Sequence, residues 1–266
     1  MAKYIYEHKN WTDFIWDDKA INAVFGEVRL MQGKIIGQMN ALGFSAKEEA
    51  TLTALTLDVV KSSEIEGEML NYDQVRSSIA RRLGINTAGL VPGSRHIEGV
   101  VEMMLDATQR YNLPLTEKRL FGWHAALFPT GHSGPYEIEV GKYRTGKMQV
   151  VSGAMGKEKV HYEAVKPGRV KTEMDEFLDW FNNDDKLDAV LKAAIAHFWF
   201  IIIHPFDDGN GRIVRAITDM LLARAEGSGE RFYSMSAQIL EERKGYFEIL
   251  QKVQHSTGDI TGWLEW

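Results

Sequence analysis

Apolar residues recur along most of this chain every three or four positions, which is the spacing of helices that bury one face. Ser45 and, three residues on, Glu48 have the form of a capping box, so we expect a helix to begin there. Asp73, Ser94 and Thr116 precede three further periodic segments and can cap them. The expected helices are 18–42, 45–66, 73–84, 94–111, 116–128, 170–182 and 187–203. The pattern therefore predicts an all-α protein.

One stretch departs from this pattern. Between Pro129 and Pro167 glycine, proline and serine cluster, which is typical of turns and loops. Two runs inside it, around 141–152 and 159–162, predict a two-stranded β-hairpin. We see no internal repeat. The expected architecture is a helical protein that carries one small hairpin.

The most informative segment is HPFDDGNGR, residues 204–212, which joins two helices. The first helix is expected to end at His204, because Pro205 cannot continue a hydrogen-bonded turn. The second is expected to start around Arg212. Its apolar face would carry Val214, Ile217 and Leu221. The free N–H groups and the positive dipole end of such a helix favour a bound phosphate.

Two side chains of this segment suit catalysis at phosphorus. An unperturbed histidine has a pKa of about 6.5, so His204 can be neutral at physiological pH and take a proton from an attacking hydroxyl. Asp208 suits Mg²⁺, because this ion is usually held by one or two carboxylates together with substrate phosphates. A base and a metal ligand are thus predicted four residues apart.

The remaining polar positions suit phosphate binding. Gly209 and Gly211 allow the backbone to approach an anion closely. Asn210 and the loop amides can receive phosphate oxygens. Arg212 and Arg215 are three residues apart, hence on one helical face, and their planar guanidinium groups match phosphate geometry. Together these groups predict displacement at phosphorus.

Composition narrows the class of protein. The net charge of −6 argues against sequence-independent nucleic-acid binding, which needs a basic surface. The 266 residues include no cysteine, which excludes disulfides and thiol nucleophiles and suits a reducing compartment. No apolar run reaches 18 residues, and the first residues lack the apolar core of a signal peptide. We expect a cytoplasmic protein that binds neither membrane nor nucleic acid through this chain.

The run His-Pro-Phe-x-Asp-Gly-Asn-Gly-Arg-x-x-Arg resembles the signature of the Fic (Fido) domain family, and residues 204–215 contain every fixed position of it. The resemblance implies an all-α Fic fold with a β-hairpin flap and a bacterial-type protein adenylyltransferase. Such an enzyme moves AMP from ATP to a hydroxyl side chain of a target protein. It implies that His204 is the base and that Asp208 holds Mg²⁺. The implied phosphate ligands are Asp208, Gly209, Asn210, Gly211, Arg212 and Arg215.

The resemblance extends beyond the signature, over about Ser94 to the C-terminus. Residues 141–163 are similar to the family's flap, which implies that the target segment is aligned by Met148, Gln149, Val150 and Val151. The helix that carries Tyr246 is similar to the region that borders the adenine. We expect a catalytic domain over 91–266 after an N-terminal helical domain over 1–90.

A second motif lies upstream. Ser62, Glu66 and Gly67 fit Ser/Thr-x-x-x-Glu-Gly/Asn, which resembles the family's inhibitory motif. Ser62 and Glu66 are four residues apart and so share a helical face. The resemblance implies that Glu66 pairs with Arg215 and keeps ATP from binding productively. We expect an enzyme that inhibits itself in cis.

Several alternatives stay open. The same fold could transfer another phosphate-containing group, or remove AMP with a water positioned by Glu66, or act as a silent interaction module. Self-modification and a homodimer are also open. His197 and His124 are expected to be packed histidines rather than metal ligands. A helix that starts near Asp259 or Thr261 ends within about a turn, so we expect a missing C-terminal segment.

Overall fold

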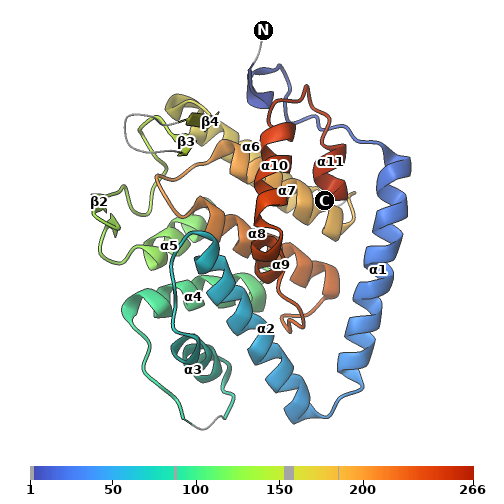
Figure 1. Ribbon diagram of the computed structural model, residues 1–266, viewed down its shortest axis with the longest axis vertical. Helices are drawn as coiled ribbons and strands as arrows, with labels where there is room; N and C mark the ends of the chain where they lie inside the picture. The colour runs from blue at the N-terminus through green and yellow to red at the C-terminus, as the bar shows by residue number, and fades with distance from the viewer. Residues whose placement is uncertain (1–2, 87–88, 153–158, 185) are drawn as a thin grey trace.

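The computed structural model describes residues 3–86, 89–152, 159–184 and 186–266. It is mostly helical with two small hairpins, so the predicted fold class is confirmed (Figure 1). The N-terminal elements are η1 (Ile5–Glu7), α1 (Asp18–Asn40), α2 (Phe44–Ile65), α3 (Tyr72–Leu83), α4 (Arg95–Gln109) and α5 (Glu117–Leu127). The strands β1 (His132–Ser133), β2 (Tyr136–Glu137), β3 (Gln149–Ser152) and β4 (Lys159–Glu163) follow. The last helices are α6 (Pro167–Asn183), α7 (Ala189–Ile203), α8 (Asn210–Glu226), α9 (Met235–Glu241), α10 (Arg243–Val253) and α11 (Thr261–Glu265).

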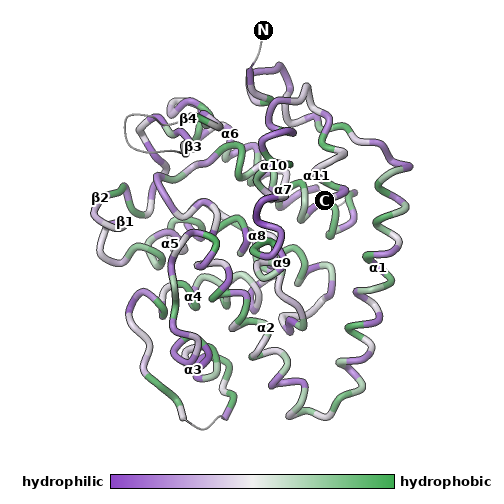
Figure 2. Tube along the Cα trace, viewed as in Figure 1, coloured by the Kyte–Doolittle hydropathy of each residue, from purple (hydrophilic) through white to green (hydrophobic). Residues whose placement is uncertain are grey.

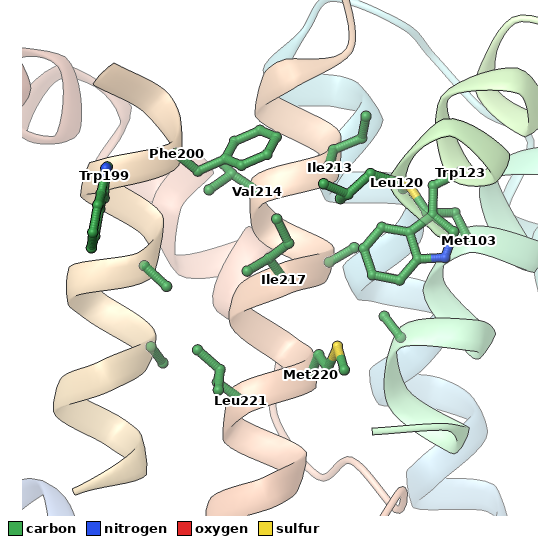
Figure 3. Close-up of a cluster of buried hydrophobic side chains, with 14 of the residues drawn as sticks. Met103, Leu120, Trp123, Trp199, Phe200, Ile213, Val214, Ile217, Met220 and Leu221 are labelled. Atoms are coloured by element: carbon green, nitrogen blue, oxygen red, sulfur yellow. The ribbon is translucent and has the colours of Figure 1, made fainter. Parts of the chain in front are cut away.

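Helix α8 lies at the centre of the core. Val214, Ile217 and Leu221, the predicted apolar face, are all buried. Figure 3 shows α8 between α7, which contributes Trp199 and Phe200, and the helices α4 and α5. Burying each large apolar side chain contributes roughly 1.5–3 kcal/mol relative to leaving it exposed. This packing holds the N-terminus of α8 in one place.

Helix α2 belongs to the same core. Leu52, Leu55 and Val59 are buried on its inner face. The Asp58 carboxylate accepts hydrogen bonds from the Ser234 hydroxyl and from the Ser236 N–H (3.0 Å) at the start of α9. The C-terminal half of α2 is therefore tied to the helices around α8. The division into domains at residue 90 stays a prediction.

Several predicted helix starts are confirmed and others are wrong. Ser94 and Thr116 cap α4 and α5 as expected. The capping box at Ser45 is wrong, because α2 already begins at Phe44 after Gly43, with no side-chain cap. Asp73 is not a cap either. It lies inside α3, whose first turn is capped by Asn71, the acceptor of the Gln74 N–H (3.0 Å).

The predicted hairpin is confirmed as β3 and β4, which pair antiparallel with Val150 opposite Tyr162. Its first strand starts only at Gln149, since 141–148 is a loop that turns at Gly141, where φ is +68°. The register shifts between Val150 and Val151. The connection 153–158 lies outside the described residues. The pair β1 and β2 was not anticipated, because two-residue strands leave no alternating pattern.

Helix α1 lies along one side of the molecule, on the opposite side from α4 and α5 (Figure 1). It mixes hydrophobic and hydrophilic residues along its length (Figure 2), and Ile21 is its buried residue. The expected C-terminal helix is α11. Its N-cap position is Ile260, although Asp259 Oδ1 accepts from the Thr261 N–H (2.9 Å). Across the described ranges, no helix is both long and apolar enough to span a membrane.

Candidate functional site

The end of α7 is held in an unusual conformation. His204 has φ +51° and ψ +62°, the left-handed region that residues other than glycine adopt at a cost. The buried guanidinium of Arg144 donates to the carbonyl of His204 (2.7 Å) and to that of Ile203 (3.3 Å). The same group donates to the carbonyls of Gly146 (2.8 Å) and Val165. One side chain thus joins the base of the flap to the residue expected to be catalytic.

The loop that follows is held by Asn210. Its Oδ1 accepts from the Phe206 N–H (2.9 Å), and its Nδ2 donates to the Phe206 carbonyl (2.8 Å). Gly209 has φ +79°, and a Cβ there would lie 2.9 Å from the Phe128 ring. Helix α8 therefore begins at Asn210, two residues before the predicted start. In this structure the Asn210 side chain shapes the loop, and the first N–H groups of the helix are the ones free to bind an anion.

These residues line a cavity of ≈ 660 Å³ at the N-terminus of α8. The predicted residues that line it are Glu66, His204, Asp208, Asn210, Gly211, Arg215 and Tyr246. They come from the turn after α2, from α8 and α10, and from the loop after α7, which are distant in sequence. The cavity lies within the size range of small-molecule sites.

The contacts of His204 fix its tautomer. Nδ1 lies 3.3 Å from the carbonyl of Ile201, and because a carbonyl only accepts, Nδ1 carries the hydrogen. Nε2 therefore keeps its lone pair. The pKa of His204 is lowered to about 4, chiefly by burial and also by the positive charge of Arg144. The hydrogen bond with the Ile201 carbonyl acts in the opposite direction and is outweighed. The imidazole is neutral at pH 7 and can accept a proton.

Asp208 has the chemistry of a metal ligand that works together with a substrate. Its carboxylate accepts from the Ser133 hydroxyl and from the Gly209 N–H (2.6 Å), and it lines the cavity. In the part of the chain that the structure describes, no three His, Cys, Asp or Glu side chains form a metal cluster. One carboxylate is nevertheless the usual protein share of a Mg²⁺ site that substrate phosphates complete. The residues fit Mg²⁺ bound together with a nucleotide.

The two other predicted histidines are packed. His124 stacks on Phe206 at 4.4 Å, accepts from the Gly141 N–H (3.1 Å) and contacts the Asp208 carbonyl through Nε2. Burial lowers the pKa of His124 to about 4. His197 contacts the hydroxyl of Tyr246 at 2.9 Å, and burial lowers its pKa to about 3. These contacts position the loop and Tyr246, as expected of packed histidines.

Arg215 is occupied by the upstream motif. Its Nη2 donates to Glu66 Oε1 (2.8 Å) and to the Ser62 carbonyl (2.8 Å), and its Nε donates to the Ser62 hydroxyl (2.8 Å). A Cβ added to Gly211 would collide with the Glu66 carboxylate, so that carboxylate lies against the first turn of α8. Gly67 ends the segment with φ +84°. The predicted pairing of Glu66 with Arg215 is present.

Arg212 has a carboxylate partner of its own. Its Nη1 donates to Glu68 Oε2 (2.7 Å), its Nη2 lies 3.9 Å from Asp208 Oδ2, and its guanidinium lies over the Phe128 ring. Arg212 is buried and is not among the residues that line the cavity. Both arginines of the segment are thus paired with carboxylates from the turn after α2.

The four predicted flap residues lie in β3 or directly before it. Met148 is half-buried against the core, and its carbonyl accepts from the Ala164 N–H (2.9 Å). Gln149 is exposed. Val150 and Val151 lie in β3, whose pairing with β4 is the described part of their geometry. Of the four, Met148 precedes the strand rather than lying in it.

Two segments of the chain match known protein families. Residues 114–222 match the Fic/DOC family, and residues 4–85 match a domain of unknown function (DUF4172). Residues 114–222 are a Fic/DOC domain. The matched segment runs from before α5 into α8 and contains the whole 204–215 junction, whereas α2 and the Glu66 that follows it lie in the other matched region.

The similar proteins are Fic proteins too. The chain is 28% identical over 228 residues to protein adenylyltransferase fic-1 of Caenorhabditis briggsae, covering 78% of this chain and 41% of that protein. It is 30% identical over 184 residues to protein adenylyltransferase Fic of Drosophila willistoni, covering 68% and 34%. The chain thus spans between about a third and two fifths of the length of these relatives.

Two solved structures share the fold. A Fic family protein from Desulfovibrio desulfuricans G20 superposes with a TM-score of 0.65 at 24% identity, covering 92% of this chain and 70% of that one. A Fic domain containing signaling protein from Bacteroides thetaiotaomicron gives 0.62 at 20% identity, covering 92% and 90%. The fold of this Fic/DOC protein is therefore shared over nearly its whole described length.

Sequence reasoning missed two residues of the site. Arg144 stands in a loop among turn residues, where a single arginine looks solvated. Glu68 looks like one more surface carboxylate after Glu64 and Glu66. Its position two residues after Glu66 was the one available signal, because the turn at Gly67 places both carboxylates near α8.

Proposed function

We propose that this chain is an autoinhibited protein adenylyltransferase, which moves AMP from ATP to a hydroxyl side chain of a target protein. The observation that carries the proposal is the convergence of His204, Asp208 and Arg215 on one cavity at the N-terminus of α8. The names of the relatives, which are protein adenylyltransferases, support the same reaction.

The proposed reaction is a single displacement. The target hydroxyl oxygen attacks the α-phosphorus of ATP, the bond from that phosphorus to the bridging oxygen of the β-phosphate breaks, and pyrophosphate leaves. The free Nε2 of His204 takes the hydroxyl proton as the new bond forms. Arg215, once free of Glu66, and the first N–H groups of α8 stabilise the phosphate charge.

Mg²⁺ is the metal that we propose for this site. Asp208 would hold it together with the phosphates of ATP, and the ion would offset the charge that develops on pyrophosphate. The flap, from Met148 to Val151, would align the target segment by main-chain pairing at β3. Tyr246 would border the adenine, and it lines the same cavity as His204 and Asp208.

The contacts of Arg215 support the proposal of inhibition in cis. Glu66 and Ser62 use the donors that a phosphate needs, and the Glu66 carboxylate lies where an anion would meet the first turn of α8. We therefore propose that the resting protein is weakly active. The lack of cysteine suits a reducing compartment, and we propose a cytoplasmic location.

The test compares Glu66→Gly with the unchanged protein on a cell lysate, using α-labelled and γ-labelled ATP in parallel. We expect Glu66→Gly to increase protein labelling from α-labelled ATP at least tenfold over the unchanged protein and to give no increase in label from γ-labelled ATP. Glu66→Gly combined with His204→Ala should return labelling to background. Mass spectrometry of the products identifies the added group and any self-modification.

The other outcomes decide between the alternatives. An increase in label from γ-labelled ATP over the unchanged protein, lost again with His204→Ala, would establish phosphate transfer instead. Loss of AMP from a modified protein, without incorporation, would establish AMP removal. A folded Glu66→Gly variant that binds ATP but labels nothing would favour a silent interaction module.

A further inference from the structure

The turn after α2 carries two carboxylates, Glu66 and Glu68. Glu68 makes an ion pair of its own, separate from the pairing of Glu66 with Arg215. Glu68 Oε2 accepts from Arg212 Nη1 at 2.7 Å, in parallel with Glu66 on Arg215. The two arginines are three residues apart on α8, and Gly67 separates the two glutamates. One short segment therefore neutralises both guanidinium groups at the head of α8.

Glu68 is held in this position from two sides. His96 on α4 contacts the same Oε2 through Nε2 at 3.1 Å. The Glu68 N–H donates to the Ser63 carbonyl (3.0 Å), which fixes the turn. Burial alone would raise the pKa of Glu68, yet the hydrogen bond with His96 and the charge of Arg212 hold it below the usual range. The carboxylate is ionised when it binds Arg212.

The Arg212 side chain is only 2% exposed, whereas that of Glu68 is 38% exposed. Glu68 can therefore move into solvent while Arg212 stays fixed. Among the described residues, Arg212 Nε is buried without a hydrogen-bond partner, and Nη2 lies 3.9 Å from Asp208 Oδ2, beyond hydrogen-bond distance. An anion that replaced Glu68 would meet a guanidinium already oriented beside the metal carboxylate. A carboxylate and a phosphate oxygen compete for the same donors.

We propose that Glu68 is a second inhibitory carboxylate, which competes with the phosphates of the nucleotide for Arg212. The proposal rests on the proposed function, because it requires a nucleotide at the head of α8. The Glu68 side chain is partly exposed, so rotation about its own bonds would free Arg212 without moving the turn or α2.

The test measures ATP and ADP binding by calorimetry, with magnesium present, for the unchanged protein, Glu68→Gln, Glu66→Gly and the double variant. Glutamine keeps the size of the side chain and removes its charge. We expect Glu68→Gln to bind ADP about tenfold more tightly, which is the effect of one charged hydrogen bond. Glu64→Gln is the matched control, because this substitution removes the same charge from the same segment. Glu64 pairs with Lys61 at 2.7 Å rather than with an arginine of α8. The control should leave the affinity unchanged.

Kinetics separates competition from a structural role. In the Glu66→Gly background, Glu68→Gln should lower KM for ATP about tenfold and leave kcat unchanged, as expected for removal of a ground-state competitor. Unchanged or weaker ADP binding by Glu68→Gln would overturn the proposal, and equal urea midpoints would show that the variant is folded. If Glu66→Gly transfers no AMP, the proposed function fails, while the ADP titration still tests Glu68. If no variant binds nucleotide, both fail.

Discussion

Replacing Arg144 by methionine tests whether one buried guanidinium supports the site. Arg144 is 2% exposed and donates to four carbonyls, two of them at the end of α7. Each buried acceptor left without a donor costs about 1–3 kcal/mol, and removing the buried charge offsets part of this loss. We expect Arg144→Met to lower the free energy of unfolding by about 3 kcal/mol.

Urea denaturation followed by circular dichroism measures this loss. Arg110→Met is the matched control, because Arg110 pairs with Asp106 at 3.5 Å and its side chain is 70% exposed. Exposed ion pairs contribute about 0–1 kcal/mol, so the control should lose less than 1 kcal/mol. A loss below 1 kcal/mol for Arg144→Met as well would refute the reasoning.

The same variant also tests the charge at His204. Arg144 lies beside His204 and, after burial, lowers its pKa. Removing that positive charge should raise the pKa of His204, so the acid limb of the pH–kcat profile should move to higher pH in the Glu66→Gly background. Titration of His204 by NMR reads the shift directly. An unchanged acid limb in a folded variant would show that Arg144 acts on packing alone.

Two further predictions concern stability. Asn210→Ala should cost about 2–4 kcal/mol, because it leaves the Phe206 N–H and carbonyl without partners in a buried loop; a loss no larger than that of Asn183→Ala, an exposed asparagine, would contradict it. The pKa values of about 4 for His124 and His204 and about 3 for His197 lie below the unfolded value of about 6.5. Their stabilisation is therefore complete above pH 6.5 and is lost as pH falls towards 4, because the unfolded chain binds the protons. The urea midpoint should fall steadily from pH 7 to 5, and a constant midpoint would rule this out.

Much of the fold could be predicted because its helices obey local rules. Ser94 and Thr116 cap helices where the apolar period begins, and Pro205 ends α7 at the predicted residue. The errors at Ser45 and Asp73 have one cause. A side chain that can cap often lies within the first turn instead, and tertiary packing selects the start.

The candidate site also has a part that the sequence predicts and a part that it does not. The junction 204–212 could be predicted because its residues are contiguous and each has a distinct chemistry. Arg144 and Glu68 could not, because their roles depend on which carbonyls and which arginine lie near them after folding. Asn210 was predicted as a phosphate ligand, yet its side chain closes a hydrogen-bonded ring with Phe206, which a list of residues does not reveal.

The burial of α2 has a consequence for how the site can be switched on. Leu52, Leu55 and Val59 fill the same interior as α8, and Asp58 is fastened to the start of α9. Cleavage that removed the first 66 residues would therefore expose to water the core that α2 covers. We therefore expect release of the proposed inhibition to involve the side chains of the 66–68 turn rather than removal of α2.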